Sequence, residues 1–316
     1  TSPQRVVLIP SVSYGIASVA KNISFAPGEE ILLLEEQYPS NYYSWKNISD
    51  RQDVKLTIIP RPQAEAQAGQ IWNEEILKAI QPATKVVALG QVHWTDGTLF
   101  DLEAIGKKAR ENGALLIIDG SQSIGALPFD QAKIKADALF AVGYKWLLGP
   151  FALGLGYLGE AFDGGSPLEE NWINRQDSDD FQGLVDYTPY YRPEAARYSV
   201  GENSNFHLLP ILQKSLENLL SWGVEEIQTY CQSITKEPLE QLSAWGCQME
   251  TEANRAHHLI GIRFPSGFDL RKLQVALQEN QVYASLRGDA LRISVHCYTD
   301  AQDLGKLTSV IRQVLG

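Results

Sequence analysis

The sequence predicts an α/β protein with a mostly parallel central sheet. Short apolar segments alternate with helix-like segments through the first half of the chain, which is typical of a parallel sheet covered by helices. The length of 316 residues suits two domains, or one large α/β domain with a smaller appendix. Strands are expected at residues 6–9, 31–34, 54–59, 85–89, 114–118, 138–142 and 153–158.

Helices are expected between these strands at residues 14–24, 73–80 and 101–112. The second ends at Gln81-Pro82, a helix stop, and the third ends at Asn112-Gly113, a typical C-cap pair. Residues 160–200 are polar and aromatic without periodicity, which predicts a long loop region. Loops of this length usually carry a function or an interface.

The second half of the chain predicts a separate, smaller unit. Helices are expected from about residue 206 to 222 and from 224 to 245. We therefore expect a large domain over residues 1–220 and a small α+β domain over residues 221–316. The remaining elements of the small domain are expected to be a strand at 258–264, a helix at 269–279, strands at 282–286 and 290–295, and a helix at 300–314.

Composition excludes several classes of protein. The net charge of -11 argues against a general nucleic-acid binder, and no apolar run approaches the ~18 residues that span a bilayer. The three cysteines are widely spaced, so neither a disulfide framework nor a zinc site is expected. A strand begins within a few residues of Thr1, which suggests that an N-terminal segment is missing. The cytoplasm is the default location.

Lys145 and Asp119 carry the functional prediction. Asp119 ends an apolar strand, and Lys145 lies in the segment Gly-Tyr-Lys-Trp-Leu-Leu-Gly-Pro at residues 143–150. A lysine that can form a Schiff base, paired with a carboxylate at a strand end, is what pyridoxal 5'-phosphate (PLP) chemistry requires. The carboxylate would keep the pyridine nitrogen protonated, so that the ring draws electrons from the substrate Cα.

Three further segments could complete a cofactor site. The turn Ser11-Val12-Ser13 precedes a helix and could bind a phosphate, although Ser13 could equally be an ordinary N-cap. Tyr38 could stack on the pyridine ring, or it could be a half-buried turn residue. Gln122 lies close enough to Asp119 to hydrogen-bond the ring hydroxyl, although it could also be an ordinary loop amide.

With these motifs, the chain resembles the class V branch of the fold-type-I PLP enzymes. That group includes aminotransferases, cysteine desulfurases, kynureninases, C–S lyases and isopenicillin epimerase-like proteins. The resemblance extends nearly end to end, and its most specific parts are residues 119–122 and 143–150, with further landmarks at 93–98 and 197–205. It implies a large domain with a mostly parallel seven-stranded sheet, a small α+β domain and an active site at a homodimer interface.

The resemblance also implies roles for single residues around the cofactor. Lys145 would be the imine lysine and the proton shuttle at Cα, Asp119 the partner of the pyridine nitrogen, and Gln122 that of the ring oxygen. Tyr38 falls where kynureninases stack a Phe and desulfurases a His. Val12 and Ser13 stand where the phosphate is held, and Tyr144 occupies a position at which kynureninases bind phosphate through a tyrosine.

Three more roles follow from the resemblance. Trp172 and Asn203 resemble residues that reach the phosphate from the neighbouring subunit, although Glu202 or Ser204 could be the true equivalent of Asn203. Arg292 matches the arginine that clamps the substrate's α-carboxylate in a two-point contact. The alternative for Arg292 is a buried structural arginine.

The expected function is that of a PLP-dependent enzyme acting on an amino acid or related primary amine, with an aminotransferase as the first choice. A lyase of the kynureninase or C–S type and an epimerase are the alternatives, and a non-catalytic relative fits poorly. Desulfurase activity is disfavoured because no cysteine precedes Arg292 in the required loop; Cys297 follows it and is expected to serve packing. No metal is expected, since His257 and His258 would point to opposite faces of a strand.

Overall fold

A computed structural model describes residues 2–63 and 67–316. Its seven-stranded sheet has the order β1-β7-β6-β5-β4-β2-β3. β7 is antiparallel to both of its neighbours, and the other pairs are parallel. The predicted α/β class is therefore confirmed. The strands are β1 (Val6–Ile9), β2 (Glu30–Leu34), β3 (Lys55–Ile59), β4 (Thr84–Gly90), β5 (Leu115–Asp119), β6 (Ala138–Val142) and β7 (Gly154–Leu158).

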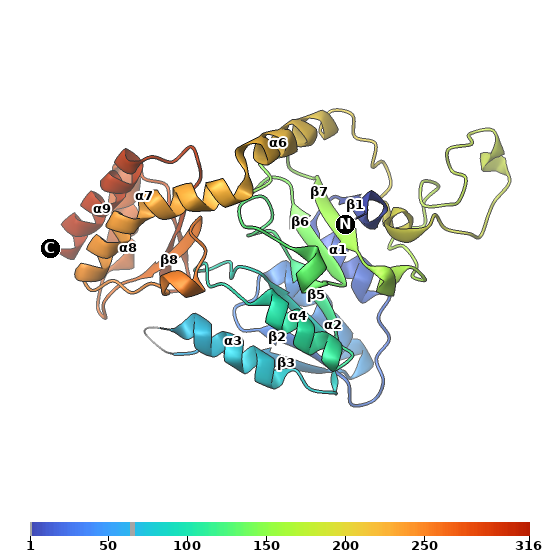
Figure 1. The fold of residues 1–316 in the computed structure, drawn as a ribbon, viewed down its shortest axis with the longest axis horizontal. Coiled ribbons are helices and arrows are strands. Elements are labelled where there is room, and N and C mark those ends of the chain that lie inside the picture. Colours follow the sequence, from blue (N-terminus) through green and yellow to red (C-terminus); the bar gives the residue numbers. More distant parts are fainter. Residues whose placement is uncertain (1, 64–66) are drawn as a thin grey trace.

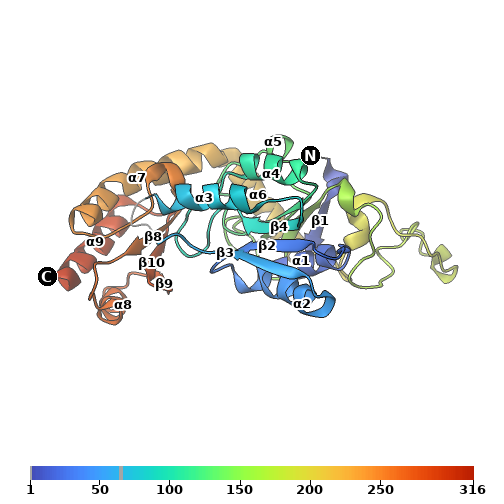
Figure 2. The ribbon, with the colours of Figure 1, turned by 90° about the horizontal axis from the view of Figure 1, so that it is seen from below.

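Helices cover both faces of this sheet (Figure 2). Alternate residues of β2 point to opposite faces, so Ile31 and Leu33 enter one core while Leu32 and Leu34 enter the other. Two packed layers thus hold the strand ends in place. One face carries α1 (Val12–Ala20) and α2 (Tyr43–Gln52); the other carries α3 (Ala68–Ala79), α4 (Leu102–Glu111) and the short α5 (Gln131–Ile134).

The helices differ from the prediction more than the strands do. α1 and α3 begin earlier than expected, at Val12 and Ala68, and α2 and α5 were not expected at all. α2 has the sequence YSWKNISDRQ and buries only Trp45, so it lacks the apolar stripe that reveals an amphipathic helix. α5 spans only four residues, which is too short for a periodic signal.

The C-terminal unit is built on a three-stranded antiparallel sheet with the order β8-β10-β9. A turn at Gly223 separates the helix Leu209–Trp222 from the helix Val224–Ala244. The strand β9 begins a few residues later than expected. Figure 1 shows this unit at the end of the molecule that holds the C-terminus. Its elements are α7 (Val224–Ala244), β8 (Leu259–Arg263), α8 (Leu270–Glu279), β9 (Ser285–Arg287), β10 (Ala290–Ser294) and α9 (Ala301–Leu315). The helix α6 (Leu209–Trp222) leads into this unit and lies near β6 and β7 in Figure 1.

The loop after β4 joins the two units. The backbone N–H of Gly261 in β8 donates to the carbonyl of Asp96, at 2.9 Å. Gly97 has φ +81°, and a Cβ at this position would lie 1.8 Å from the carbonyl oxygen of Leu259. Only glycine permits this approach, which places the C-terminal unit against the carboxyl ends of the central strands.

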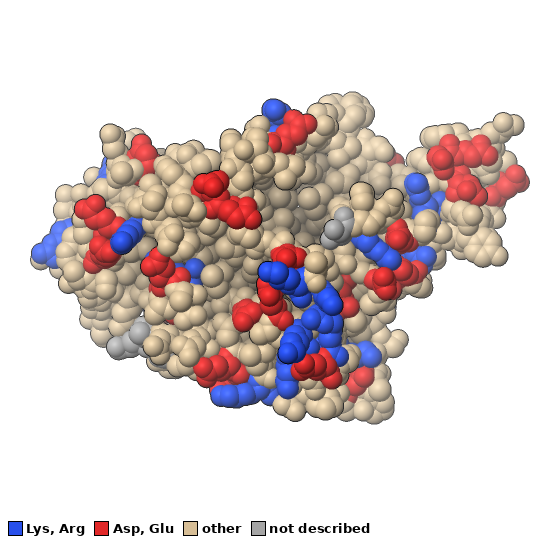
Figure 3. All heavy atoms as spheres, in the orientation of Figure 1, with Lys and Arg blue, Asp and Glu red and all other residues tan. Residues whose placement is uncertain are grey.

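A long arm, residues 166–193, projects from the large unit between β7 and α6 (Figure 1). Only short 3-10 turns interrupt the predicted loop region, at Glu160–Phe162, Gly183–Val185 and Glu194–Tyr198. Phe181 is 72% exposed and Tyr187 is 96% exposed. Acidic side chains gather on the arm, whereas basic ones gather over α4 (Figure 3). No helix in the described part of the chain is long and apolar enough to cross a membrane.

Candidate active site

Lys145 and Asp119 line one cavity at the carboxyl ends of the central strands. Asp119 is the last residue of β5, and Lys145 lies in the loop that follows β6. Because β5 and β6 are neighbouring parallel strands, with Asp119 opposite Phe140, their carboxyl ends lie together. The cavity has a volume of about 210 Å³, and we call it the Lys145 cavity.

The loop that carries Lys145 has a constrained backbone. The N–H of Gly149 donates to the carbonyl of Gly143, at 2.7 Å, so the loop closes on itself. A Cβ on Gly143 would lie 2.3 Å from the carbonyl oxygen of Leu153. Leu148 and Ala152 have positive φ angles, a conformation that is costly for side chains of this kind. The strand ends and this closed loop together hold Lys145 at the cavity wall.

Burial shifts the pKa values of both residues. It lowers the pKa of Lys145, and the charges of Arg292 and Arg287 lower it further, while Asp119 opposes the shift. Burial also raises the pKa of Asp119, against hydrogen bonds from Ser121 and the charge of Lys145. The Lys145 amine is therefore closer to its neutral, nucleophilic form than a lysine in water.

Gln122 lines a smaller pocket that adjoins the Lys145 cavity and shares Lys145, Asp119 and Tyr38 with it. The indole Nε1–H of Trp146 donates to Oε1 of Gln122, at 3.0 Å. Since an indole N–H can only donate, this contact fixes which end of the amide is oxygen. The amide nitrogen of Gln122 is therefore left to donate elsewhere.

The first turn of α1 forms another wall of the Lys145 cavity. Ser11 is the N-cap, and its Oγ accepts a hydrogen bond from the backbone N–H of Tyr14, at 3.1 Å. The alternative in which Ser13 caps this helix is therefore wrong. The N–H groups of Val12 and Ser13 lie in the first turn, where a helix has no carbonyl to offer them. Both residues line the cavity, as expected for an anion site.

Two tyrosines complete this wall. The ring of Tyr144 stacks on Phe151, with centroids 4.0 Å apart and planes inclined by 8°. The ring of Tyr38 lies under the ammonium of Lys145, whose Nζ is 5.2 Å from the ring centroid. Tyr38 also packs edge-on against Trp94. The structure thus brings Tyr38 and Tyr144 to the cavity that holds Lys145.

Arg292 lies on β10 in the C-terminal unit and is not among the residues that line the Lys145 cavity or the pocket that adjoins it. Its Nη1 donates to the backbone carbonyl of Trp94, at 2.8 Å, while its buried Nε has no partner among the described residues. Burial, and then the charge of Arg287, lower its pKa to about 10. Arg287 is a residue of the site that the sequence analysis missed. Its guanidinium lies 5.6 Å from the ring centroid of Trp94. Neither arginine forms an ion pair within the described ranges.

Trp172 and Asn203 do not line the Lys145 cavity of their own chain. Trp172 packs against Phe181 on the arm, beside a separate hollow of about 920 Å³. Asn203 is half-buried in the segment between the arm and α6. Within one chain, the structure therefore does not bring these two residues to the other expected site residues.

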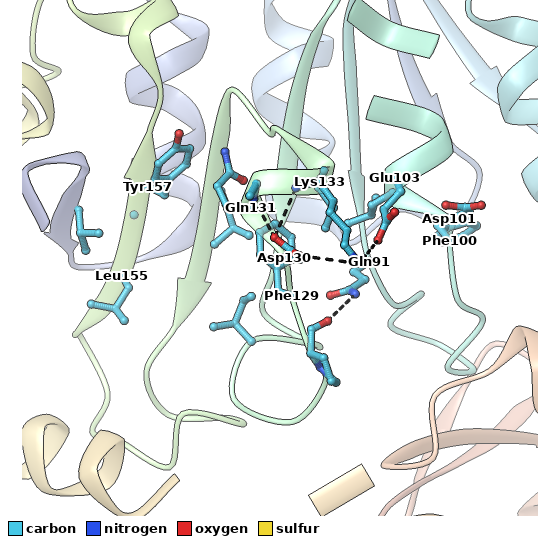
Figure 4. A pocket seen from close by; sticks show the side chains of 18 of the residues that line it. Gln91, Phe100, Asp101, Glu103, Phe129, Asp130, Gln131, Lys133, Leu155 and Tyr157 are labelled. Carbon is cyan, nitrogen blue, oxygen red and sulfur yellow. Dashed lines mark hydrogen bonds and ion pairs between the residues drawn. The ribbon is translucent and has the colours of Figure 1, made fainter. Parts of the chain in front are cut away.

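Another hollow, of about 900 Å³, lies over the α4 and α5 face of the sheet and contains neither Lys145 nor Asp119 (Figure 4). Asp130 there caps α5, and Leu155 and Tyr157 belong to β7.

Cys297 was expected to pack, and this expectation is wrong: the residue is exposed beyond the end of β10, with Sγ 3.0 Å from Nδ1 of His296. Neighbouring protein atoms still desolvate its thiol in part and raise the thiol pKa, which does not favour a nucleophile.

The chain matches a known protein family. The family model "Aminotransferase class-V" matches residues 1–307. The chain is a member of the aminotransferase class-V family. The resemblance of the motifs around Asp119 and Lys145 is thereby confirmed, and the family is one of PLP-dependent enzymes.

Relatives within this class V family have different activities. The chain is 24% identical to an uncharacterised aminotransferase, YcbU, of Bacillus subtilis, over 96% of this chain and 77% of that protein. It is 22% identical to an isopenicillin N epimerase of Amycolatopsis lactamdurans, over 99% of this chain and 81% of that protein. The cysteine desulfurase CsdA of Escherichia coli has the same fold, with a TM-score of 0.83 at 18% identity over 99% of this chain and 79% of that chain.

The residues around the Lys145 cavity fit the cofactor of the class V family. The cavity offers a lysine amine, a carboxylate and the free N–H groups of a helix start along one wall. A half-exposed aromatic ring, Tyr38, lies beside the amine. An aldehyde, a pyridine nitrogen, a phosphate and a flat ring would each find a chemically matched group here.

Proposed function

We propose that this protein is a PLP-dependent aminotransferase acting on an amino acid or a related primary amine. The observation that carries the proposal is that Lys145 and Asp119 face one cavity, with the free N–H groups of the α1 start on its wall. PLP, when bound, supplies an electron sink for the bonds at the substrate Cα. The chain's own residues would hold the reactants and move the proton.

Each proposed cofactor contact uses a group that the fold leaves available. Lys145 would hold the cofactor covalently through Nζ, and Asp119 would keep the proton on the ring nitrogen. The amide nitrogen of Gln122 would donate to the ring oxygen, because Trp146 already occupies its Oε1. Val12 and Ser13 would bind the phosphate, with Tyr144 beside them, and Tyr38 would face the ring.

Lys145 would also act as the proton carrier. With cofactor and substrate bound, the Lys145 amine would take the proton from the substrate Cα. Burial lowers its pKa, and so do Arg292 and Arg287, which makes the neutral base more accessible near neutral pH. If Lys145 returned the proton elsewhere than to Cα, transamination would follow; if the proton returned to the opposite face of Cα, the outcome would be epimerisation.

The two arginines support an anionic substrate. Arg292 and Arg287 lie close enough to affect the pKa of Lys145, and neither is neutralised by a carboxylate of the described residues. A buried, unpaired guanidinium is costly, so a ligand carboxylate would stabilise both the complex and the site. We assign the substrate α-carboxylate to Arg292.

We further propose that the protein acts as a homodimer in which the arm of one subunit completes the site of the other. The arm leaves large apolar side chains exposed, among them Phe181, Val185 and Tyr187, as an unpartnered interface would. Trp172 and Asn203 would then reach the partner's cofactor phosphate. Sedimentation should show a dimer, and an active, cofactor-loaded monomer would contradict this arrangement.

The function is tested by incubating the PLP-loaded protein with a panel of amino acids and an α-keto acid acceptor. Transamination yields a new keto acid and a new amino acid in equal amounts, and Lys145→Ala should abolish both. Pyruvate with sulfide, or anthranilate from kynurenine, would instead identify a lyase. Loss of optical purity without a keto acid would identify an epimerase. A lyase product or an epimerised substrate without transamination would contradict the aminotransferase assignment.

A further inference from the structure

A line of hydrogen bonds runs from α7 to Gln122 through one buried histidine. His258, which precedes β8, is 0% exposed. Its Nε2 lies 2.7 Å from the backbone carbonyl oxygen of Gln122, and its Nδ1 lies 2.8 Å from Nε2 of Gln228 in α7. The indole of Trp146, which donates to the side chain of the same Gln122, packs edge-on against the imidazole.

The partners of His258 determine which of its nitrogens carries the proton. A carbonyl oxygen can only accept, so Nε2 must carry hydrogen and donate to Gln122. The amide of Gln228 is held by two backbone groups: its Nε2 donates to the carbonyl of Ala126, at 2.6 Å, and its Oε1 accepts from the N–H of His257, at 3.2 Å. Its NH₂ group therefore faces Nδ1 of His258, which must accept.

This arrangement is satisfied only by a neutral imidazole. A proton on Nδ1 would face the NH₂ group of Gln228, and turning that amide over would set its oxygen against the carbonyl of Ala126. Burial, together with the nearby His296 and His257 and against the bond to Gln122, lowers the pKa of His258 to about 4. His258 is therefore a fixed, one-directional donor and not a titrating switch near neutral pH.

We propose that His258 is a positioning residue that holds Gln122, in the loop that follows Asp119, in place beside Lys145. The proposal rests on the proposed function, because it concerns the group that Gln122 presents to the cofactor. Gln122 is held at two points, by His258 on its backbone and by Trp146 on its side chain. Through His258, α7 and the rest of the C-terminal unit help to set the orientation of the Gln122 amide, which lines the smaller pocket beside the Lys145 cavity.

The test compares two substitutions at one position. His258→Leu removes both ring nitrogens, whereas the amide nitrogen of His258→Gln can take the place of Nε2 as the donor. We expect His258→Leu to bind PLP about tenfold more weakly, the equivalent of one lost buried hydrogen bond, and to change the visible absorption band of the bound cofactor. His258→Gln should restore both properties. His257→Gln is the matched control and should resemble the wild type.

Two results would overturn the proposal. One is a folded His258→Leu variant with wild-type cofactor affinity and absorption. The other is a folded His258→Gln variant that loses cofactor affinity and the wild-type absorption as fully as His258→Leu does. The hydrogen-bond donor at position 258 would then not matter. If His258→Leu does not fold, Gln228→Met serves in its place: it removes the NH₂ group that fixes the imidazole, so it should weaken PLP binding and change the absorption band in the same direction as His258→Leu. A folded Gln228→Met variant with wild-type cofactor affinity and absorption would contradict the proposal.

The histidine itself can be measured without cofactor. In the ¹⁵N-histidine-labelled protein, His258 should be a neutral Nε2–H tautomer between pH ~5 and ~8. A protonated ring or an Nδ1–H tautomer would contradict the network. Failure of the wild type to take up PLP would instead contradict the proposed function, while this spectrum would still test the hydrogen-bond line.

Discussion

The backbone N–H of Ser121 donates to Oδ1 of Asp119, at 3.0 Å. This contact joins the end of β5 to the loop that follows it, and it holds the carboxylate in one orientation at the cavity wall. The bond uses Oδ1 of the carboxylate. An asparagine at position 119 could keep the same contact through its own Oδ1, which makes it a clean substitution for testing the charge alone.

Asp119→Asn should slow turnover while leaving PLP binding largely intact. A neutral amide cannot keep the ring nitrogen protonated, and the loss of one such charge interaction costs a few kcal/mol in the transition state, or on the order of 10²–10³ in kcat. Steady-state kinetics and equilibrium PLP titration of the same preparation measure the two effects separately. A variant with the wild-type kcat would show that the partner of the ring nitrogen has been misassigned.

Arg292→Lys should raise KM for carboxylate substrates by about 10- to 100-fold, because an ammonium cannot make the planar two-point contact. The matched control is Arg287→Lys, a substitution of the same kind on the neighbouring strand. We expect it to have the smaller effect on a substrate with a single carboxylate. Comparable KM values for the wild type and Arg292→Lys would mean that the carboxylate binds elsewhere.

Tyr38→Leu should weaken PLP binding by about 2- to 10-fold, the range expected for the loss of one aromatic contact. Tyr38→Phe keeps the ring beside Lys145 and should stay close to the wild type. Fluorescence titration of the apoprotein with PLP distinguishes the two variants. If Phe and Leu weaken binding equally, the hydroxyl group of Tyr38 matters and the ring does not.

Asp96 links the pH dependence of stability to the junction of the two units. Its carboxylate contacts Arg61 and, at 3.4 Å, Arg263 of β8. Burial alone would raise its pKa, but His93, Arg61 and Arg263 outweigh burial and hold the pKa well below the ordinary value of 3.8. Because the folded-state pKa is depressed, this stabilisation is complete above the unfolded-state pKa and is lost as the pH falls toward the folded-state value.

Asp96→Asn should therefore lower the free energy of unfolding at pH ~7 by about 3 kcal/mol, since it removes the charge of the buried carboxylate that both arginines share. The difference from the wild type should shrink below pH ~4, by about 1.4 kcal/mol per unit. The control is Glu36→Gln, which removes a half-exposed partner of Arg61 and should cost less than about 1 kcal/mol. Denaturant titrations at several pH values measure this, and a pH-independent difference would contradict the account.

The strands of the large unit could be predicted within one or two residues because they are short apolar runs, and the inner ones such as β2 and β4 are buried on both faces. The residues at their carboxyl ends followed from the same pattern, since parallel strands bring such ends together. Val12, Ser13, Tyr38, Asp119 and Lys145 all lie within a few residues of a strand end, and the structure brings them to one cavity.

The parts that could not be predicted depend on contacts between distant segments. Arg287 and Trp94 meet only because β9 packs beside the loop after β4. The role of His258 depends on Gln122 and Gln228, neither of which is near it in sequence. The proposed roles of Trp172 and Asn203 require a second subunit, so a single chain does not test them.

The central claim is that Lys145 carries PLP. Reduction of the PLP-loaded protein with borohydride fixes a cofactor bound to a lysine, and mass spectrometry of the peptides then identifies the residue. We predict the phosphopyridoxyl label on the peptide that contains Lys145, in the wild type and in Asp119→Asn, and no label at this site in a folded Lys145→Ala variant. A label on a different lysine, or an unlabelled Lys145 in the loaded wild type, would contradict the account.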